Sequence, residues 1–191
     1  MRALVTPPCM TVTFALLLML TLVPAGCSTF SGKAEARTDK QTQVMEFLDA
    51  GKPKAALTTA DDLVAESPDD YRNYLLRNAV QIVLRDYASA RADNDKALEV
   101  FEATKTRYPE KERNLRLARI HESMALTALI ASRRAPDEAE RKRLEGVCEQ
   151  EAAQVKALDE DTWNHLRGMT GDRLNQDKGS QGEGGQAKDA Q

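Results

Sequence analysis

The strongest constraint on the fold is a helix-turn-helix pattern that occurs twice between Gly51 and Leu98 in a common register. Ala56 and Ala90, the equivalent small residues of the two copies, lie 34 positions apart. The positions that mark the two copies are Gly51, Ala56, Leu57 and Pro68 in the first, and Tyr87, Ala90, Ala97 and Leu98 in the second. A pattern that recurs at this spacing indicates helix pairs that stack, because one pair cannot bury its apolar face alone.

Turn residues divide this region into successive helices. The segment 49–53 predicts a helix end and a new start, because glycine tolerates the left-handed cap and proline fits the first helical turn. The segment 67–70 (Ser-Pro-Asp-Asp) combines a capping hydroxyl, a proline and acids near the positive end of a helix dipole. Helical signals therefore begin at Thr38, and further helices are expected at about 70–84 and 88–107.

The register and its small residues resemble the tetratricopeptide repeat, a helix pair of about 34 residues. Counting from Arg37 or from Tyr71, the residues at the family's positions are Gly51, Ala56 and Pro68 in the first unit, and Tyr74, Tyr87, Ala90 and Ala97 in the second. The second unit departs from the pattern: Arg85 replaces the turn glycine, and the terminal proline is displaced to Pro109, about two turns late. The overlong second helix is where the groove is expected to depart from the family shape.

A third, more degenerate helix pair follows, with its turn at Ser132–Asp137. Trp163 and Leu166 are placed to cover the open end of the stack. We therefore expect an all-α fold, a short right-handed solenoid of about three antiparallel helix pairs with a capping C-terminal helix, spanning residues 38–168. Residues 169–191 are expected to be a disordered tail, because the sequence there is rich in Gly, Gln, Lys and Asp.

The N-terminus carries an export signal. Thr11 to Val23 is an uncharged apolar run, shorter than the about 20 residues that span a bilayer but suited to a signal peptide over residues 1–26. Ala25-Gly26-Cys27 resembles the lipoprotein signal of bacteria, although Pro24 stands where a leucine is usual. The alternative is an ordinary cut after Ala25, which releases a soluble protein in which Cys27 and Cys148 could pair.

The lipoprotein resemblance implies that Cys27 carries acyl chains and that residues 27–37 form a tether to the membrane. Ser28 after the cysteine, in place of aspartate, resembles the sorting pattern for the outer membrane. The expected location is the inner leaflet of the outer membrane, facing the periplasm. Cys148 is then the remaining thiol, and its place on an apolar stripe predicts an inert, buried side chain.

Composition and motifs exclude several functions. The net charge of −3 without a basic block argues against nucleic acid as a partner. No nucleophile motif, phosphate-binding glycine loop or paired-cysteine metal spacing occurs, so neither an enzyme nor a cofactor is expected. His121 is interpreted as a packed or hydrogen-bonded structural residue and His165 as an exposed polar neighbour of Trp163. An acidic cluster at residues 61–70 and a basic cluster at 133–143 are interpreted mainly as solvated faces and caps.

The expected function is binding. A stack of helix pairs presents a groove lined by first-helix side chains, and such grooves bind peptide segments or partner domains. The candidate partner-binding residues are Tyr74, Asn78, Gln81, Arg85 and Asn94. The resemblance to assembly-factor and secretin-pilotin lipoproteins of the outer membrane implies a scaffold that recruits an envelope protein. The alternative is a ligand-binding accessory subunit of a periplasmic transport system.

Overall fold

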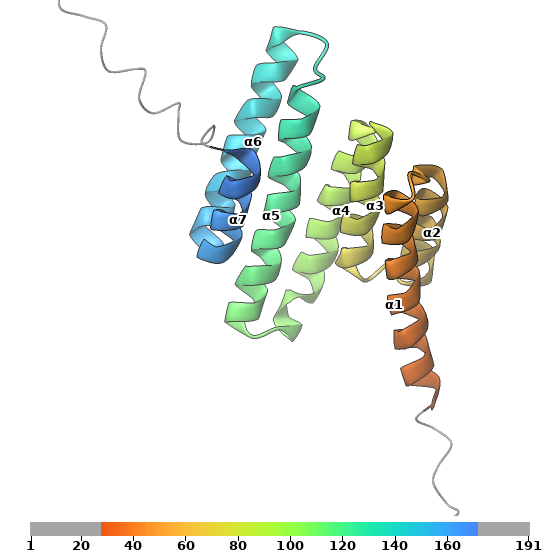
Figure 1. Cartoon of the computed structure of the whole chain (residues 1–191). Coiled ribbons are helices and arrows are strands. Elements are labelled where there is room, and N and C mark those ends of the chain that lie inside the picture. Colours follow the sequence, from red (N-terminus) through yellow and green to blue (C-terminus); the bar gives the residue numbers. More distant parts are fainter. Residues whose placement is uncertain (1–27, 172–191) are drawn as a thin grey trace, which may run out of the picture. The chain divides into compact units, whose positions relative to one another are not determined.

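The computed structural model describes residues 28–171, with side chains from Asp39 onward, and this part of the chain is helical throughout (Figure 1). The elements are α1 (Ser28–Asp49), α2 (Pro53–Glu66), α3 (Tyr71–Leu84), α4 (Tyr87–Thr104), the 3₁₀ helix η1 (Lys105–Arg107), α5 (Glu110–Ser132), α6 (Glu138–Leu158) and α7 (Glu160–Thr170). The prediction of an all-α fold is confirmed for these residues. Within them no helix is both long and apolar enough to cross a membrane. The expected signal peptide, Cys27 and most of the expected tail lie outside this range.

The chain divides into two units, residues 1–39 and 40–191, and the packing described below lies within the second. Helix α1 begins at Ser28, ahead of the expected start at Thr38, so residues 28–37 of the predicted tether are helical. The segment 33–37 (Lys-Ala-Glu-Ala-Arg) consists of strong helix formers, which outweigh the single unfavourable Gly32. At the other end, α7 continues to Thr170, past the predicted domain end at residue 168.

Two helix ends share one geometry at the register seen in the sequence. Gly51 has φ +67° and donates its N–H to Leu48 O, while Lys52 N–H reaches Phe47 O. Arg85, 34 positions later, has φ +66° and donates to Ile82 O, while Asp86 N–H reaches Gln81 O. Both are Schellman caps, in which a left-handed residue satisfies the last helical carbonyls. Arg85 therefore replaces the glycine of the repeat pattern but adopts the same turn geometry.

Aspartates begin four of the helices. The carboxylates of Asp70, Asp86, Asp137 and Asp159 each accept a hydrogen bond from a backbone N–H in the first turn that follows. Such caps satisfy donors that have no partner inside the helix. The break expected after residue 107 is also present: Tyr108 is extended before Pro109, although α4 itself ends at Thr104 and η1 covers the remainder.

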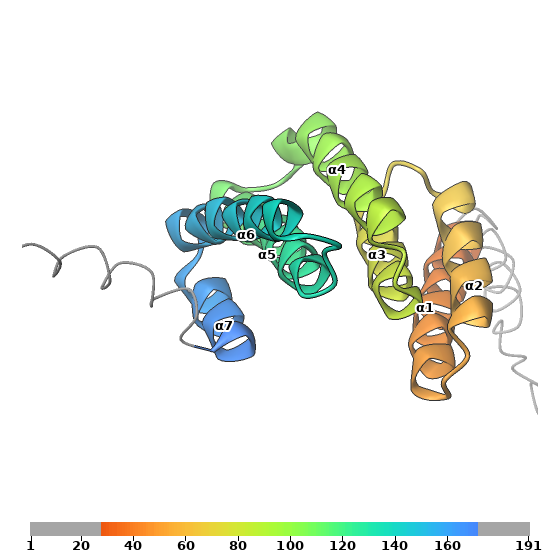
Figure 2. The same ribbon diagram turned by 90° about the horizontal axis from the view of Figure 1, so that it is seen from above.

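The core consists of three apolar clusters, each shared by three successive helices. Their buried members are Val44, Ala56, Ala60, Leu63 and Val80 on α1–α3; Tyr71, Tyr74, Ala97, Val100, Phe101 and Ile120 on α3–α5; and Ala125, Ala128, Cys148, Ala152, Val155 and Leu166 on α5–α7. Each helix thus packs on its neighbours along the chain, with further contacts between α3 and α5 and between α5 and α7. In Figure 2, α4 and α6 lie on one side of unit 2 and α3, α5 and α7 on the other. We call the odd-numbered helices the odd layer and the even-numbered ones the even layer.

Helix α7 packs against the last pair as the sequence predicted. Leu166 is fully buried against α5 and α6, and Trp163 packs on the same cluster. The Lys156 ammonium lies 5.7 Å from the centre of the Trp163 ring. A cation over an aromatic face adds to the apolar contact that holds this helix.

Candidate functional site

Four of the five residues predicted to line a groove are buried between helices. Tyr74, Asn78, Gln81 and Asn94 are each at most 8% exposed, and the Tyr74 hydroxyl donates to Pro68 O at 3.1 Å. Arg85 is exposed, at the end of α3 and one turn after Gln81. Because packing encloses these side chains, they leave little surface for a partner, and an accessible groove must be lined by other residues.

Two of them belong instead to a buried polar cluster that joins α3, α4 and α5. The side-chain amides of Asn78 and Asn94 both donate to Thr127 Oγ1, at 3.1 and 3.0 Å. The Ser123 hydroxyl donates to Asn94 Oδ1 at 2.8 Å, and Asn78 also donates to Ala90 O at 2.7 Å. Since a buried polar group without a partner is costly, this network favours one alignment of the three helices. Sequence reasoning missed Ser123 and Thr127, whose hydroxyls give no periodic signal on an apolar helix.

An open hollow of about 450 Å³ lies between α1 and α3, two helices of the odd layer that run side by side. Its lining residues are Gln41, Thr42 and Met45 on α1, and Arg72, Leu75, Leu76 and Ala79 on α3. Met45 is 49% exposed, and Ala79 is exposed as well. The lining is mostly apolar and carries one formal charge, on Arg72.

The base of this hollow is held by Asn73. Its fully buried amide donates to Leu63 O at 2.9 Å and to Ser67 O at 3.2 Å, which ties α3 to the end of α2. Gln41 on α1 donates to Asn73 Oδ1 at 3.4 Å. The Asn73 side chain therefore links α1, α2 and α3, and its longest bond, to Gln41, joins the two helices that form the walls of the hollow.

Arg72 is oriented by the aspartate that caps its helix. Its Nε lies 3.0 and 3.2 Å from the two carboxylate oxygens of Asp70, and its Nη2 lies 2.8 Å from Oδ2. These hydrogen bonds raise the pKa of Arg72, while the positive charge of the nearby Arg116 acts to lower it. The Asp70 side chain is 10% exposed but that of Arg72 is 57% exposed. The bonds to Asp70 use Nε and Nη2, and the guanidinium has further N–H donors on a side chain that is largely exposed beside the apolar lining.

The large apolar side chains that are exposed lie on helices of the odd layer. Among the residues whose side chains the structure describes, Met45, Val83, Leu115 and Met169 are 49%, 54%, 40% and 47% exposed. They lie on α1, α3, α5 and α7, so all four belong to the odd layer. Isolated exposed apolar residues are ordinary on a protein surface, but their restriction to one layer distinguishes the two faces.

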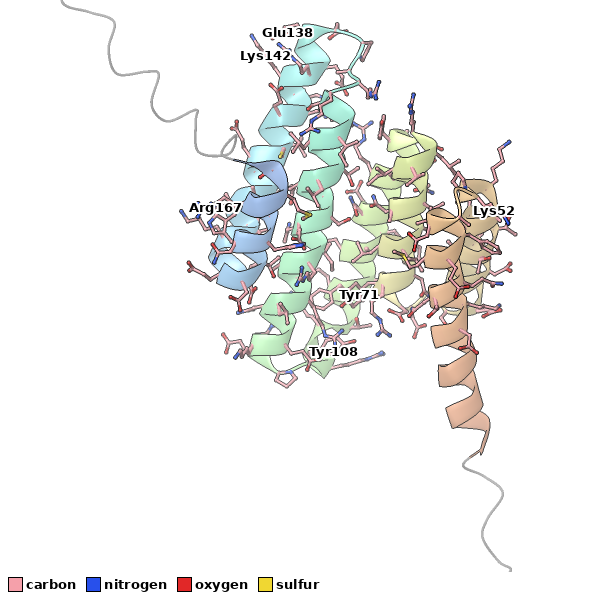
Figure 3. All side chains as sticks on the ribbon, in the orientation of Figure 1. Lys52, Tyr71, Tyr108, Glu138, Lys142 and Arg167 are labelled. Atoms are coloured by element: carbon pink, nitrogen blue, oxygen red, sulfur yellow. The ribbon has the colours of Figure 1, made fainter. Side chains whose placement is uncertain are left out.

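An aromatic cluster joins the extended end of α4 to α3 and α5. The Phe101 ring meets Tyr71 edge-on at 5.3 Å and stacks on Tyr108 at 6.0 Å; in Figure 3, Tyr71 lies at the lower end of α3 and Tyr108 lies below it, between η1 and α5. Arg116 lies 4.3 Å over the Tyr108 ring and donates to the Tyr71 hydroxyl at 3.1 Å. The proline at the end of the second unit, Pro109, comes seven residues later than in the repeat pattern. The contacts above pack the segment before it against α3 and α5.

The acidic residues of segment 61–70 are divided among separate contacts. Asp61 pairs with Arg77 at 2.9 Å, Glu66 pairs with Lys40, and Asp70 caps α3. Arg77 also pairs with the buried Asp93 at 2.6 Å, which raises the pKa of that guanidinium. The interpretation of Asp61, Glu66 and Asp70 as helix surface and cap residues agrees with these partners.

The basic residues around the α5–α6 turn are largely balanced by acids on α6. Arg141 and Lys142 pair with Glu138, and Arg143 pairs with Glu140 at 2.7 Å. Figure 3 places Glu138 and Lys142 together at the tip of this helix pair. Paired, solvent-exposed charges of this kind leave a weak net field.

Both histidines are joined to buried glutamates. His121 Nδ1 lies 2.6 Å from Glu151 Oε2 and links α5 to α6, which confirms the prediction of a hydrogen-bonded structural residue. His165 is exposed, as expected, but its Nδ1 also lies 2.6 Å from Glu122 Oε1 and links α7 to α5. Within residues 39–171 no group of three or more His, Cys, Asp or Glu side chains has metal-binding geometry.

Cys148 is a free, buried thiol on α6. Burial, with the charges of Glu149 and Glu145, raises its pKa to about 11. The prediction of a buried side chain is confirmed, and this environment disfavours the thiolate, which is the reactive form. Cys27, the predicted lipidation site, lies outside the described residues.

Comparisons with known proteins leave the site to be interpreted on its own geometry. No protein-family model matches this chain, and no curated protein or solved structure matches it.

Proposed function

We propose that this chain is a lipid-anchored protein of the bacterial envelope, which acts as an interaction scaffold or assembly factor through a short helical-repeat stack. The observation that carries the scaffold proposal is the restriction of the large exposed apolar side chains to the odd layer. An envelope protein that binds there buries these side chains, whereas the even layer presents mainly charged and small residues to solvent.

The repeat interpretation is supported by two features of unit 2. The core clusters are each shared by three consecutive helices, as in solenoids whose stability comes from nearest-neighbour interfaces. The Schellman caps at Gly51 and Arg85 repeat at the same interval as Ala56 and Ala90. A tetratricopeptide-like solenoid of about three pairs, closed by α7, accounts for both.

The scaffold proposal is favoured over ligand transport by the shape of the surface. A transport accessory needs an enclosed cavity, whereas three hollows formed by residues 39–171, between α1 and α3, beside Asp159 and beside Arg167, open to solvent. Open, partly apolar surfaces suit a peptide segment or a partner domain. Crosslinking in intact cells followed by purification should recover a distinct envelope protein; recovery of lipid and this chain alone would contradict the scaffold.

The membrane location depends on Cys27. We expect Cys27→Ser to move the protein from the membrane fraction to the soluble periplasmic fraction, because two or more acyl chains are needed for stable anchoring. Cys148→Ser is the matched control and should leave fractionation unchanged, since that thiol is buried in the core. Retention of Cys27→Ser in the membrane fraction would show that the lipoprotein interpretation is wrong.

A further inference from the structure

We propose that the hollow between α1 and α3 binds a protein segment in which an acidic side chain lies close to a large apolar one. The proposal deepens the scaffold function above, on which it rests, by assigning one binding site within the odd layer and the chemistry of its occupant.

The apolar part of the occupant follows from the lining. Met45, Leu75, Leu76 and Ala79 form most of the surface, and Met45 and Ala79 are exposed. A partner side chain that enters the hollow removes this apolar area from water, a gain of roughly 25 cal/mol for each Å² buried. The Asn73 bonds to Leu63 O and Ser67 O join α3 to the end of α2, and Asn73 also accepts a longer bond from Gln41 on α1.

The acidic part follows from Arg72. It is the charged residue of the lining, its side chain is 57% exposed, and Asp70 fixes its orientation through Nε and Nη2. The remaining guanidinium donors match a carboxylate, which accepts hydrogen bonds from such a fork in a defined plane. The nearby Arg116 is paired with Glu112, so the positive charge of the hollow is that of Arg72.

The separation of the two features sets the spacing in the partner. Leu75 and Leu76 follow Arg72 by about one helical turn, or roughly 5 Å along α3. A helical partner therefore presents its acidic and apolar residues three or four positions apart, and an extended one presents them two positions apart.

Other occupants of the hollow fit less well. A two-fold dimer through this patch pairs the lining with itself, and the lining contains no acidic residue to meet either Arg72. The chain's own C-terminal sequence after Leu174 contains no apolar residue larger than alanine, so it cannot fill the hollow. A segment of another protein satisfies both the apolar lining and the arginine.

The test uses the full chain, purified in mild detergent, and a phage-displayed library of random peptides. We expect the enriched peptides to carry Asp or Glu within four positions of Leu, Ile, Phe or Met. For a labelled synthetic copy of the most enriched peptide, measured by fluorescence anisotropy, Arg72→Glu should raise Kd by about tenfold or more. Lys54→Glu makes the same charge change on exposed α2 and should leave Kd nearly unchanged.

A charge swap separates recognition from folding. Replacing the peptide's acidic residue by lysine should weaken binding to the native chain and restore it to Arg72→Glu, which a merely misfolded variant could not do. Ala79→Glu, which fills the hollow, should also abolish binding, whereas Ala103→Glu on exposed α4 should not.

Three outcomes would overturn the proposal. Enriched peptides that bind Arg72→Glu and Ala79→Glu as tightly as the native chain would place the binding site elsewhere and leave the scaffold function standing. Self-association in sedimentation that Ala79→Glu abolishes would assign the hollow to a second copy. Failure to enrich any peptide, while cells still yield a crosslinked envelope partner, would refute this occupant but not the scaffold.

Discussion

At the scale of single residues, Thr127 has the largest structural role relative to its size. Its hydroxyl accepts from both Asn78 and Asn94 and donates to Ser123 O at 2.7 Å. Both amides are 2% exposed, so water cannot replace a missing partner. Three helices thus depend on one hydroxyl for the satisfaction of their buried polar groups.

Thr127→Val keeps the shape of the side chain and removes this acceptor. We expect a loss of about 2 kcal/mol in the free energy of unfolding, because the Asn94 amide is then buried without its partner. Urea unfolding followed by circular dichroism measures the change. Thr106→Val, at an exposed position on η1, is the control, and an equally small effect of both substitutions would contradict the role of the polar cluster.

Sequence reasoning identified Asn78 and Asn94 as notable but placed them on the wrong kind of surface. A polar residue on a helix that is apolar over most of its circumference can face a groove or a buried partner, and the sequence pattern is the same in both cases. The partners, Ser123 and Thr127, lie about 30 to 50 positions away on α5, so only the tertiary arrangement decides between the two.

At the scale of elements, local chemistry determines the helix boundaries. The caps at Asp70, Asp86 and Asp137, the two left-handed caps and Pro109 lie where the sequence predicted turns, whereas the turn at Asp159 was not predicted. The early start of α1 was missed because a run of good helix formers carries no apolar period to signal it. The layer to which each helix belongs could not be predicted from the sequence either, because it depends on packing between helices.

The equivalence of Gly51 and Arg85 predicts stability changes of opposite sign. Gly51→Ala should destabilise the protein by about 1 kcal/mol, because its φ of +67° is strained for alanine even though a Cβ there meets no atom within 4 Å. Arg85→Gly should stabilise it by up to about 1 kcal/mol by relieving the same strain at φ +66°. Thermal unfolding of both variants measures the effects; changes of the same sign would contradict the repeated cap.

At the scale of the whole molecule, the turns, the core packing and the exposed surface are connected. Repeated turns produce successive helix pairs, shared core clusters hold these pairs together, and the packing leaves apolar side chains exposed on one layer. The proposed anchor at Cys27 brings this surface close to a membrane, where its partner is expected. We therefore expect the envelope partner to bind the odd layer.

Site-specific photocrosslinking in intact cells tests this claim most directly. A photoreactive amino acid is introduced at Met45 and Val83 on the odd layer, and at Ala65 and Ala92, which are exposed on the even layer. We predict that the odd-layer positions yield a discrete crosslinked envelope protein and that the even-layer positions do not. Equal crosslinking from both layers, or crosslinks confined to Ala65 and Ala92, would contradict the account.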